Sequence, residues 1–278
     1  MKEFKDKVAA ITGAGSGMGR ELAVQLAARG CHVAISDVNE KGLAETAELA
    51  KKHGVKVTAT KVDVASKDAV YAWAEQVAKD HGKVNLIFNN AGVALGATVE
   101  GMQYKDFEWL FNINFWGVVY GTKAFLPHIK AAGEGHIINT SSVFGLVGIP
   151  SQSAYNAAKF AVRGFTESLR QELDMMACGV SATSVHPGGI KTNIARAARQ
   201  DTSIEALGMK AEGSAEKFEK NFITTAASAA KTIIRAVEKD KRRVLVGPDA
   251  YVIDWLARLL PALYQRLTVF FARKSMAK

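Results

Sequence analysis

Two side chains that could transfer a proton, Tyr155 and Lys159, stand four residues apart. The residues from Ser153 onward are typical of a helix, which would put both side chains on one face. A free tyrosine has a pKa near ~10, and an ammonium held nearby favours the phenolate and lowers that pKa. Ser142, upstream, could return through a loop and donate a hydrogen bond to a substrate oxygen. The spacing alone is equally compatible with an ordinary helix that carries a packed tyrosine and a surface lysine.

A glycine-rich segment near the N-terminus is suited to binding phosphate. An apolar run over residues 8–12 leads into Gly13-Ala-Gly-Ser-Gly-Met-Gly19, and a helical pattern continues to Arg29. Glycines let the backbone approach a pyrophosphate, and a helix N-terminus offers unpaired N–H groups. The spacing Gly-x-x-x-Gly-x-Gly differs from the commoner Gly-x-Gly-x-x-Gly fingerprint. The segment predicts a strand, a nucleotide-binding turn and a helix.

A carboxylate ends the next predicted strand, which covers residues 33–37. Asp37 follows the glycine-rich segment by about 20 residues, the distance at which a carboxylate accepts hydrogen bonds from an adenosine ribose. The alternative is that it caps the helix starting near Asn39.

Strand and helix patterns alternate along most of the chain. Predicted strands cover 55–62, 86–88, 136–140, 180–185 and 244–246, and predicted helices cover 66–79, 107–129, 153–176 and 224–239. This alternation favours an α/β fold, a doubly wound, Rossmann-like parallel sheet of about seven strands flanked by helices. Right-handed crossovers would bring the strand ends, and the motifs on them, to one rim. The polar stretch 193–223 is predicted to form a mobile lid over the site.

The composition is that of one large domain. The chain has 278 residues, of which 48% are hydrophobic, and we expect a single domain over 1–248 with an extension over 249–278. Two cysteines, Cys31 and Cys178, indicate no disulfide framework. The N-terminus lacks the apolar stretch of a signal peptide, so the expected compartment is the cytoplasm. The net charge is +9, but no basic stripe interleaved with aromatics predicts nucleic-acid binding, and we expect no metal site.

Together these motifs resemble the short-chain dehydrogenase/reductase family over roughly residues 5–247. Thr12 to Gly19 matches the family's Thr-Gly-x-x-x-Gly-x-Gly turn, and Asn89 to Gly92 matches its Asn-Asn-Ala-Gly turn. The segment Pro187-Gly188 followed by Thr192 matches its Pro-Gly-x-x-x-Thr pattern. The family's catalytic tetrad is matched by Asn114, Ser142, Tyr155 and Lys159.

The resemblance implies a role for each matched residue. Tyr155 would be the general acid or base at the reacting oxygen. Lys159 would lower the pKa of Tyr155 and bind the nicotinamide ribose, Ser142 would hydrogen-bond the reacting oxygen, and Asn114 would hold a water that relays protons. The cofactor would be held by Gly13, Ser16, Gly17, Met18, Gly19, Asp37, Val38, Asp63, Val64, Asn90, Ala91, Gly92, Tyr155, Lys159, Pro187, Gly188, Ile190 and Thr192.

The choice between NAD and NADP can be argued from charge. Asp37 suits a ribose 2′-hydroxyl and repels a 2′-phosphate. Relatives that prefer the phosphate place Lys or Arg at the positions occupied here by Ser16 and Val38, and Arg20 lies within the helix, where it is expected at the surface. The sequence therefore predicts NAD rather than NADP.

The substrate is expected to be a hydrophobic secondary alcohol or ketone, for example a steroid-like or medium-chain compound. The run after Ser142 contains no Lys or Arg for a substrate carboxylate or phosphate, and its apolar residues are expected to line the pocket: Val143, Phe144, Leu146, Val147 and Ile149. Reduction of a 3-oxoacyl thioester is an alternative within the family. A nucleotide-sensing protein on this fold is a further alternative, although the complete tetrad argues against it.

The C-terminal residues 249–278 look like two amphipathic helices broken at Pro261. Their charges argue against a membrane-spanning helix. The favoured interpretation is that the apolar stripe packs on the body of the chain or on a neighbouring subunit of a homodimer or homotetramer. A basic anchor on a membrane surface and a flap over the substrate pocket are alternatives. The stripe contains Trp255, Leu256, Leu259, Leu260, Leu263, Leu267, Phe270 and Phe271.

Overall fold

Seven strands form one sheet in which each neighbouring pair is parallel. The computed structural model describes residues 1, 3–194, 197–209 and 222–276. The strands lie in the order β11-β7-β6-β4-β1-β2-β3. Their bounds are β1 (Val8–Thr12), β2 (His32–Asp37), β3 (Val57–Lys61), β4 (Leu86–Asn89), β6 (Gly135–Thr140), β7 (Val180–Pro187) and β11 (Arg243–Val246). The predicted doubly wound α/β fold is confirmed.

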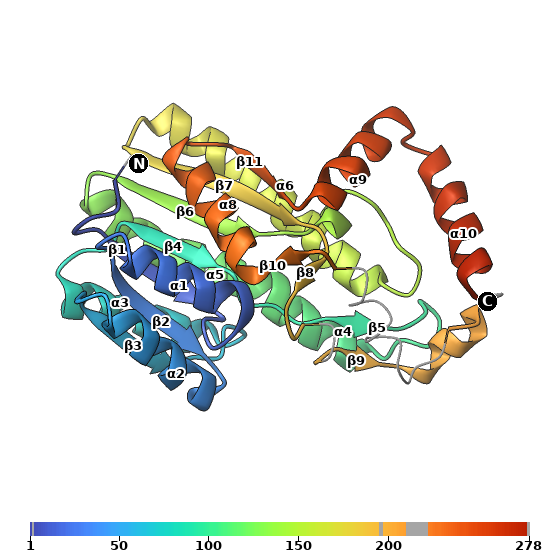
Figure 1. The fold of residues 1–278 in the computed structure, drawn as a ribbon, viewed down its shortest axis with the longest axis horizontal. Helices are drawn as coiled ribbons and strands as arrows, with labels where there is room; N and C mark the ends of the chain where they lie inside the picture. Colours follow the sequence, from blue (N-terminus) through green and yellow to red (C-terminus); the bar gives the residue numbers. More distant parts are fainter. Residues whose placement is uncertain (2, 195–196, 210–221, 277–278) are drawn as a thin grey trace.

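Helices cover both faces of the sheet (Figure 1). One apolar core lies under α1 (Gly17–Ala27), α2 (Glu40–Lys51) and α8 (Ala226–Glu238). A second core lies on the opposite face, under α3 (Lys67–His81), α5 (Gly117–Ala131) and α6 (Ser153–Met176). Burial on both faces explains why β1 and β4 are nearly continuous apolar runs, whereas the edge strand β3 is half-exposed and alternates.

The order of the strands switches sides at β1. The chain adds β2 along one edge of β1 and later adds β4 along the other edge. In such sheets ligands bind beyond the carboxyl ends of the strands at this switch point. The glycine-rich segment follows β1 at this position, and residues 90–92 follow β4. The fold therefore assembles the predicted motifs at one rim.

The predicted helix 107–129 differs from the observed one. It consists of α4 (Tyr104–Phe111), a π-helical turn η1 (Asn112–Trp116) and α5. The π turn contains the buried Asn114. Single π turns inside helices often occur at functional sites because they redirect individual backbone and side-chain groups.

Short elements surround the rim. They are β5 (Leu95–Gly96) paired with β9 (Arg199–Gln200), β8 (Ile190–Lys191) paired with β10 (Thr224–Thr225), η2 (Val143–Gly145) and η3 (Thr202–Leu207). The predicted lid over 193–223 includes residues 195–196 and 210–221, which lie outside the described residues. The lid therefore stays a prediction.

The chain ends in α9 (Pro248–Leu259) and α10 (Leu263–Met276), here called the C-terminal segment. Pro261 lies in the break between the two helices, as predicted. Figure 1 shows α9 leaving the body beyond β11 and turning into α10, which runs along the outside of the molecule. Every helix in the described ranges is too short or too polar to cross a bilayer.

Candidate active site

The glycine-rich turn brings backbone against backbone. A side chain on Gly13, which has φ of +64°, would lie 2.7 Å from the Cα of Ala91. At Gly19 a side chain would collide with the carbonyl oxygen of Gly13. A side chain on Gly17, with φ of +52°, would meet the methyl group of Thr192 at 3.0 Å. Glycine at these three positions therefore lets three loops meet closely beside the N-terminus of α1.

Thr12 and Asn90 hold the turns after β1 and β4 together. The hydroxyl of Thr12 accepts hydrogen bonds from the backbone N–H groups of Asn90 (3.0 Å) and Ala91 (3.1 Å). The side-chain amide of Asn90 donates to the carbonyl of Thr12 at 3.1 Å. Its Oδ1 is buried without a partner among the described residues. A buried acceptor of this kind is available to a ligand.

Asp37 ends β2 directly against the glycine-rich turn. Its carboxylate accepts from the N–H of Gly15 at 2.8 Å and from the N–H of Asn39 at 2.9 Å. The helix α2 is capped instead by the side chain of Asn39, which accepts from Gly42 N at 3.1 Å. The alternative role of Asp37 as a cap of this helix is therefore filled by Asn39.

Arg20 lies beside the glycine-rich turn with 28% of its side chain exposed, and it pairs there with Glu45. Its guanidinium donates to the carbonyl of Gly15 at 2.6 Å, to Thr46 Oγ1 at 3.0 Å and to Glu45 Oε2 at 2.9 Å. These bonds come from Nε and Nη2, and through them Arg20 braces the turn against α2.

The other predicted cofactor residues line the same rim. Asp63 and Val64 follow β3, and the Val64 side chain lies 3.0 Å from the place that a side chain on Gly117 would take. Ser16 precedes α1 and makes no side-chain capping bond, and Met18 lies in its first turn. The remaining members lie after β2, after β4, or at and beyond the end of β7, namely Val38, Gly92, Pro187, Gly188 and Ile190.

Tyr155 and Lys159 share the first turns of α6, as their spacing predicted. The ammonium of Lys159 lies 5.5 Å from the centre of the Tyr155 ring. Lys159 is 3% exposed, and its Nζ donates to the carbonyl of Thr140 at 2.9 Å. The side chain of Ser142 forms a hydrogen bond with Tyr155. Three of the four predicted residues therefore meet at the end of β6.

Asn114 completes the group from the π turn. Its Oδ1 accepts from the N–H of Val93 at 2.8 Å, and its Nδ2 donates to the carbonyl of Val93 at 2.8 Å. A side chain on Gly92 would lie 3.2 Å from Asn114 Oδ1 and 3.7 Å from Lys159 Nζ. Gly92 therefore lies between the Asn114 and Lys159 side chains, and a side chain at position 92 would contact both of them.

The sequence match and the geometry identify the same family. Residues 7–203 match the model of the short chain dehydrogenase family. The chain belongs to the short-chain dehydrogenase family. Its members are oxidoreductases that use a nicotinamide cofactor.

Three known proteins illustrate the similarity. The oxidoreductase SadH of Mycobacterium tuberculosis is 49% identical over 96% of this chain and 95% of its own length. A short-chain dehydrogenase/reductase of Burkholderia phymatum, solved in complex with NAD, is 32% identical with a TM-score of 0.86, over 95% of this chain and 97% of that one. Levodione reductase is 27% identical with a TM-score of 0.78, over 90% and 99% of the two chains.

Burial sets the proton affinities at the site of this dehydrogenase. It raises the pKa of Tyr155 to about 12, against the opposing effect of the hydrogen bond from Ser142. Burial also lowers the pKa of Lys159 to about 8. The prediction that Lys159 lowers the pKa of Tyr155 below its ordinary value is therefore wrong for the protein by itself. Loss of hydration, which raises the pKa of Tyr155, outweighs the hydrogen bond with Ser142, which lowers it.

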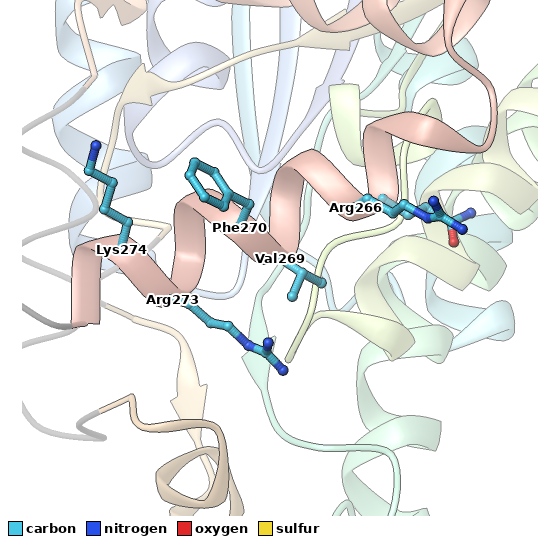
Figure 2. A pocket seen from close by; sticks show the side chains of 6 residues that line it. Arg266, Val269, Phe270, Arg273 and Lys274 are labelled. Atoms are coloured by element: carbon cyan, nitrogen blue, oxygen red, sulfur yellow. The ribbon is translucent and has the colours of Figure 1, made fainter.

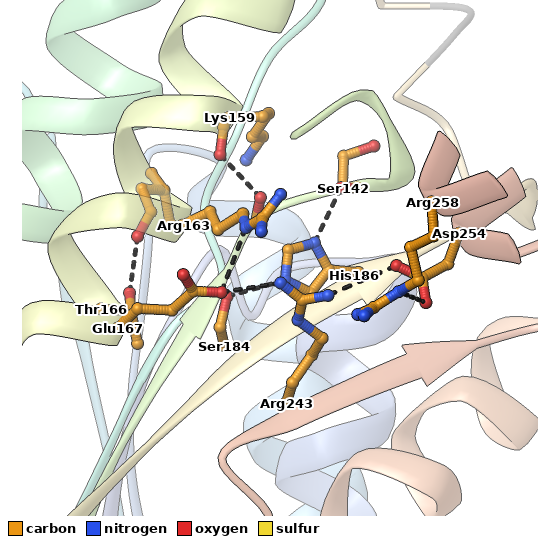
Figure 3. A network of polar contacts seen from close by, with 12 residues as sticks. Ser142, Lys159, Arg163, Thr166, Glu167, Ser184, His186, Arg243, Asp254 and Arg258 are labelled. Carbon is orange, nitrogen blue, oxygen red and sulfur yellow. Dashed lines mark hydrogen bonds and ion pairs between the residues drawn. The ribbon is translucent and has the colours of Figure 1, made fainter. Parts of the chain in front are cut away.

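Two residues that the sequence analysis did not single out for a role position the loop after Ser142. The side chain of Asn156 on α6 donates to the carbonyls of Phe144 (2.7 Å) and Val147 (2.8 Å) and accepts from the N–H of Ile149 (3.0 Å). His186 on β7 hydrogen-bonds the carbonyl of Ser142 through Nδ1 at 3.0 Å (Figure 3). Both act on backbone carbonyls, which a sequence pattern does not reveal.

His186 stays neutral in this position. Its Nε2 meets the hydroxyl of Ser184 at 2.9 Å, and burial lowers the pKa of His186 to about 4. With Nδ1 facing a carbonyl, that nitrogen carries the proton and Nε2 accepts from Ser184. The imidazole is thus a fixed link between β7 and the catalytic loop.

The apolar run after Ser142 is mostly buried. Val143, Leu146 and Val147 are buried, whereas Phe144 and Ile149 keep some exposure. The Phe144 ring meets the Tyr155 ring edge-on, with the ring centres 6.0 Å apart. That the run lines a substrate pocket stays a prediction.

The C-terminal segment reaches the rim at two points. Asp249, at the start of α9, accepts from the N–H of Gly189 at 2.6 Å. Tyr264, at the start of α10, accepts from the N–H of Gly148 at 3.0 Å. These contacts tie the segment to the loops after β7 and after Ser142.

The predicted burial of the C-terminal stripe on the body is wrong for most of its members. Leu256, Leu260 and Leu267 are half-buried. The others are exposed, with Trp255 at 64%, Leu259 at 56%, Leu263 at 46%, Phe270 at 60% and Phe271 at 62%. The helical spacing correctly identified an apolar face, but the segment turns most of that face away from the protein.

Proposed function

We propose that this dehydrogenase interconverts a hydrophobic secondary alcohol and its ketone with NAD as the cofactor. The observation that carries the proposal is the convergence of Ser142, Tyr155 and Lys159 beside the glycine-rich turn, with Lys159 buried and Ser142 hydrogen-bonded to Tyr155. Proton transfer to a carbonyl oxygen requires an acid within hydrogen-bonding reach of that oxygen, which Tyr155 can supply beside Ser142. The nicotinamide supplies or accepts the hydride on carbon.

In the direction of reduction, the Tyr155 hydroxyl donates its proton to the carbonyl oxygen as that oxygen gains the electron pair of the C=O bond. A pKa of about 12 keeps this hydroxyl protonated at neutral pH, so it is ready to act as the acid. Ser142 hydrogen-bonds the same oxygen and holds it in place. The alcohol then has the proton on oxygen and the hydride on carbon, and the tyrosinate is left beside the Lys159 ammonium.

Lys159 acts after that step. Its ammonium stabilises the tyrosinate once the proton has left, because a charge pair in a buried site interacts more strongly than in water. We propose that it also binds the nicotinamide ribose, and that a water held at Asn114 returns a proton to the site.

The rim fits NAD by the criterion of close approach. Gly13, Gly17 and Gly19 let the surrounding loops approach one another closely, and the N-terminus of α1 would face the pyrophosphate. Asp37 would accept from the adenosine ribose, and Asp63 would meet the adenine. Ile190 and Thr192 would hold the carboxamide end. Asp37 supports NAD over NADP, because its carboxylate lies against the glycine-rich turn and would repel a 2′-phosphate.

A hydrophobic substrate is supported by Phe144 and Ile149, the members of the apolar run that keep some exposure next to Tyr155. Steroid-like and medium-chain ketones are the classes we propose. We also propose a homodimer or homotetramer, because Trp116 and Phe160 are 41% and 42% exposed on neighbouring helical elements. Light scattering after gel filtration would measure the assembly.

The test is an absorbance assay at 340 nm over a panel of ketones, alcohols and one 3-oxoacyl thioester, each with NADH or NADPH and their oxidised forms. We expect turnover of apolar ketones with NADH. Turnover of the thioester alone would replace the substrate class, and preference for NADPH would contradict the cofactor assignment. Absence of turnover with every compound, despite NADH binding, would contradict the catalytic proposal.

A further inference from the structure

We infer that the C-terminal segment is a docking surface for an anionic lipid bilayer. Among the described residues, eighteen large hydrophobic side chains are exposed, and eight of them lie on this segment. They are Tyr251, Val252, Trp255, Leu259, Leu263, Val269, Phe270 and Phe271. Such clustering over two consecutive helices indicates a surface with a partner rather than scattered exposure.

Each helix divides into a protein face and an outer face. On α10, Tyr264, Thr268 and Ala272 recur every four residues, are half-buried, and include the hydrogen bond from Gly148 to the Tyr264 hydroxyl. The opposite side carries Arg266, Val269, Phe270, Arg273 and Lys274. On α9, Ala250 is buried, and the exposed apolar side chains at 251, 252, 255 and 259 lie on the other side.

The charged side chains on the outer face of α10 are all basic. Gln265, Arg266, Val269, Phe270, Arg273 and Lys274 line a shallow surface pocket (Figure 2). Within the described residues, the three cations have no acidic partner, and no Asp or Glu occurs in α10. Cationic side chains around an exposed phenyl ring match phosphate headgroups next to acyl chains.

The acidic residues of α9 are turned inward and paired. Asp254 binds Arg243 at 3.3 Å and Arg258 at 2.8 Å, and Asp249 accepts from Gly189. Figure 3 shows this ion-pair chain running from Glu167 through Arg243 to Asp254 and Arg258. The chain fixes α9 to the body while its apolar side faces outward. The docking surface is therefore attached to the body, and the two carboxylates of α9 bond to groups of the body.

The charge pattern favours lipid over a second copy of this chain. In a two-fold contact the same surface meets itself, so the cations of two α10 helices would be brought together and desolvated. An anionic bilayer provides the complementary charge and an apolar layer of the depth that aromatic side chains occupy. Since the described helices cannot span a bilayer, the association would be peripheral.

Cosedimentation of the full chain with vesicles tests the proposal. The vesicles contain phosphatidylcholine alone or phosphatidylcholine with 30% phosphatidylglycerol. The charge variant is Arg266→Gln/Arg273→Gln/Lys274→Gln, and the apolar variant is Trp255→Ser/Phe270→Ser/Phe271→Ser. The matched controls are Lys52→Gln/Lys79→Gln/Lys83→Gln, which removes the same charge from the body, and Tyr104→Ser, which removes a ring that is 88% exposed.

We expect the wild type and both controls to pellet with the anionic vesicles and to be released by salt. The charge variant should lose roughly a hundredfold in partitioning, because each of the three cations contributes about a factor of five near an anionic surface. The apolar variant should lose binding at every salt concentration. Turnover of a water-soluble ketone should be unchanged in both variants, which separates this proposal from the proposed catalysis.

Three results would overturn the inference. The first is equal pelleting of the two variants and their controls. The second is equal binding to neutral and anionic vesicles. The third is a change of oligomeric size in either variant without loss of vesicle binding, which would assign the surface to a second copy instead.

Discussion

The rim of the sheet buries polar side chains, whereas the C-terminal segment exposes apolar ones. At the rim, the buried side chains of Lys159 and His186 have fixed partners, the carbonyls of Thr140 and Ser142. On the segment, rings such as Trp255 and Phe270 stay in contact with solvent. Burying polar groups is unfavourable unless each finds a hydrogen bond, so the rim is a prearranged chemical site. Leaving rings exposed is also unfavourable, so the segment is arranged for contact with something outside the chain.

The largest expected effect is on turnover, which should depend on the rim and not on the C-terminal segment. We predict that Tyr155→Phe lowers kcat by well over ~10²-fold, since it removes the proton donor but keeps the ring and its edge contact with Phe144. NADH binding, followed by fluorescence titration, should be retained, and so should vesicle binding. The control is Tyr104→Phe, at an exposed position. Near-normal turnover by Tyr155→Phe would refute the assignment of the acid.

The second effect concerns the acid stability of the rim. The pKa of His186 falls from 6.5 to about 4 on burial, so the unfolded chain binds more protons than the folded one between these pH values. Stability is therefore complete above pH 6.5 and is lost as the pH falls towards 4, by roughly 3 kcal/mol from this residue.

His186→Gln should remove that part of the acid dependence, because glutamine does not titrate. Chemical denaturation at pH 7.5, 5.5 and 4.5 measures it as a smaller fall in the free energy of unfolding. The matched control is His53→Gln at an exposed site, which should follow the wild type. If the free energy of unfolding of His186→Gln falls with pH as much as that of the wild type, His186 is protonated as easily in the folded chain as in the unfolded one.

The third effect is on cofactor affinity. Asp37→Ala should raise the KM for NADH by about tenfold to a hundredfold, the range expected for a lost hydrogen bond to a charged group. Relative use of NADPH should rise, because a repulsion of the 2′-phosphate is lost as well. Glu40→Ala, which removes a nearby exposed carboxylate paired with Lys61, is the control. Unchanged cofactor preference in Asp37→Ala would contradict the ribose assignment.

The two regions also differ in how far the sequence could predict them. The seven strands and the tetrad residues follow from contiguous motifs with fixed spacing, because parallel strands with right-handed crossovers deliver those motifs to one rim. The pKa of Tyr155 could not be predicted, since it depends on how completely the folded site excludes water. The supporting bonds of Asn156 and His186 go to backbone carbonyls that any sequence offers.

The C-terminal segment shows a different limit of sequence reasoning. Helical spacing correctly predicted two helices with an apolar face broken at Pro261. The spacing indicates that the apolar face must contact a partner, but it does not identify that partner. Only the fold reveals that Tyr264 and Ala250 face the body while Trp255 and Phe270 face outward.

The smallest effect tests the hydrogen bond that joins the two regions. The Tyr264 hydroxyl accepts from the N–H of Gly148, in the loop that holds Ser142 next to Tyr155. Tyr264→Phe removes one neutral hydrogen bond of about 1 kcal/mol at a partly exposed position. The N–H of Gly148 can then donate to water, so the effect is small.

We therefore predict a KM for the ketone that is raised by a few fold, with kcat and the KM for NADH unchanged, because only the substrate loop loses a support. Tyr251→Phe is the control, on an outer position of α9 that is 58% exposed. If the two variants have the same ketone KM, the C-terminal segment does not act on the substrate loop, and the rim and the segment are independent. If Tyr264→Phe instead lowers kcat, the segment helps to position Ser142 and not only the loop beyond it.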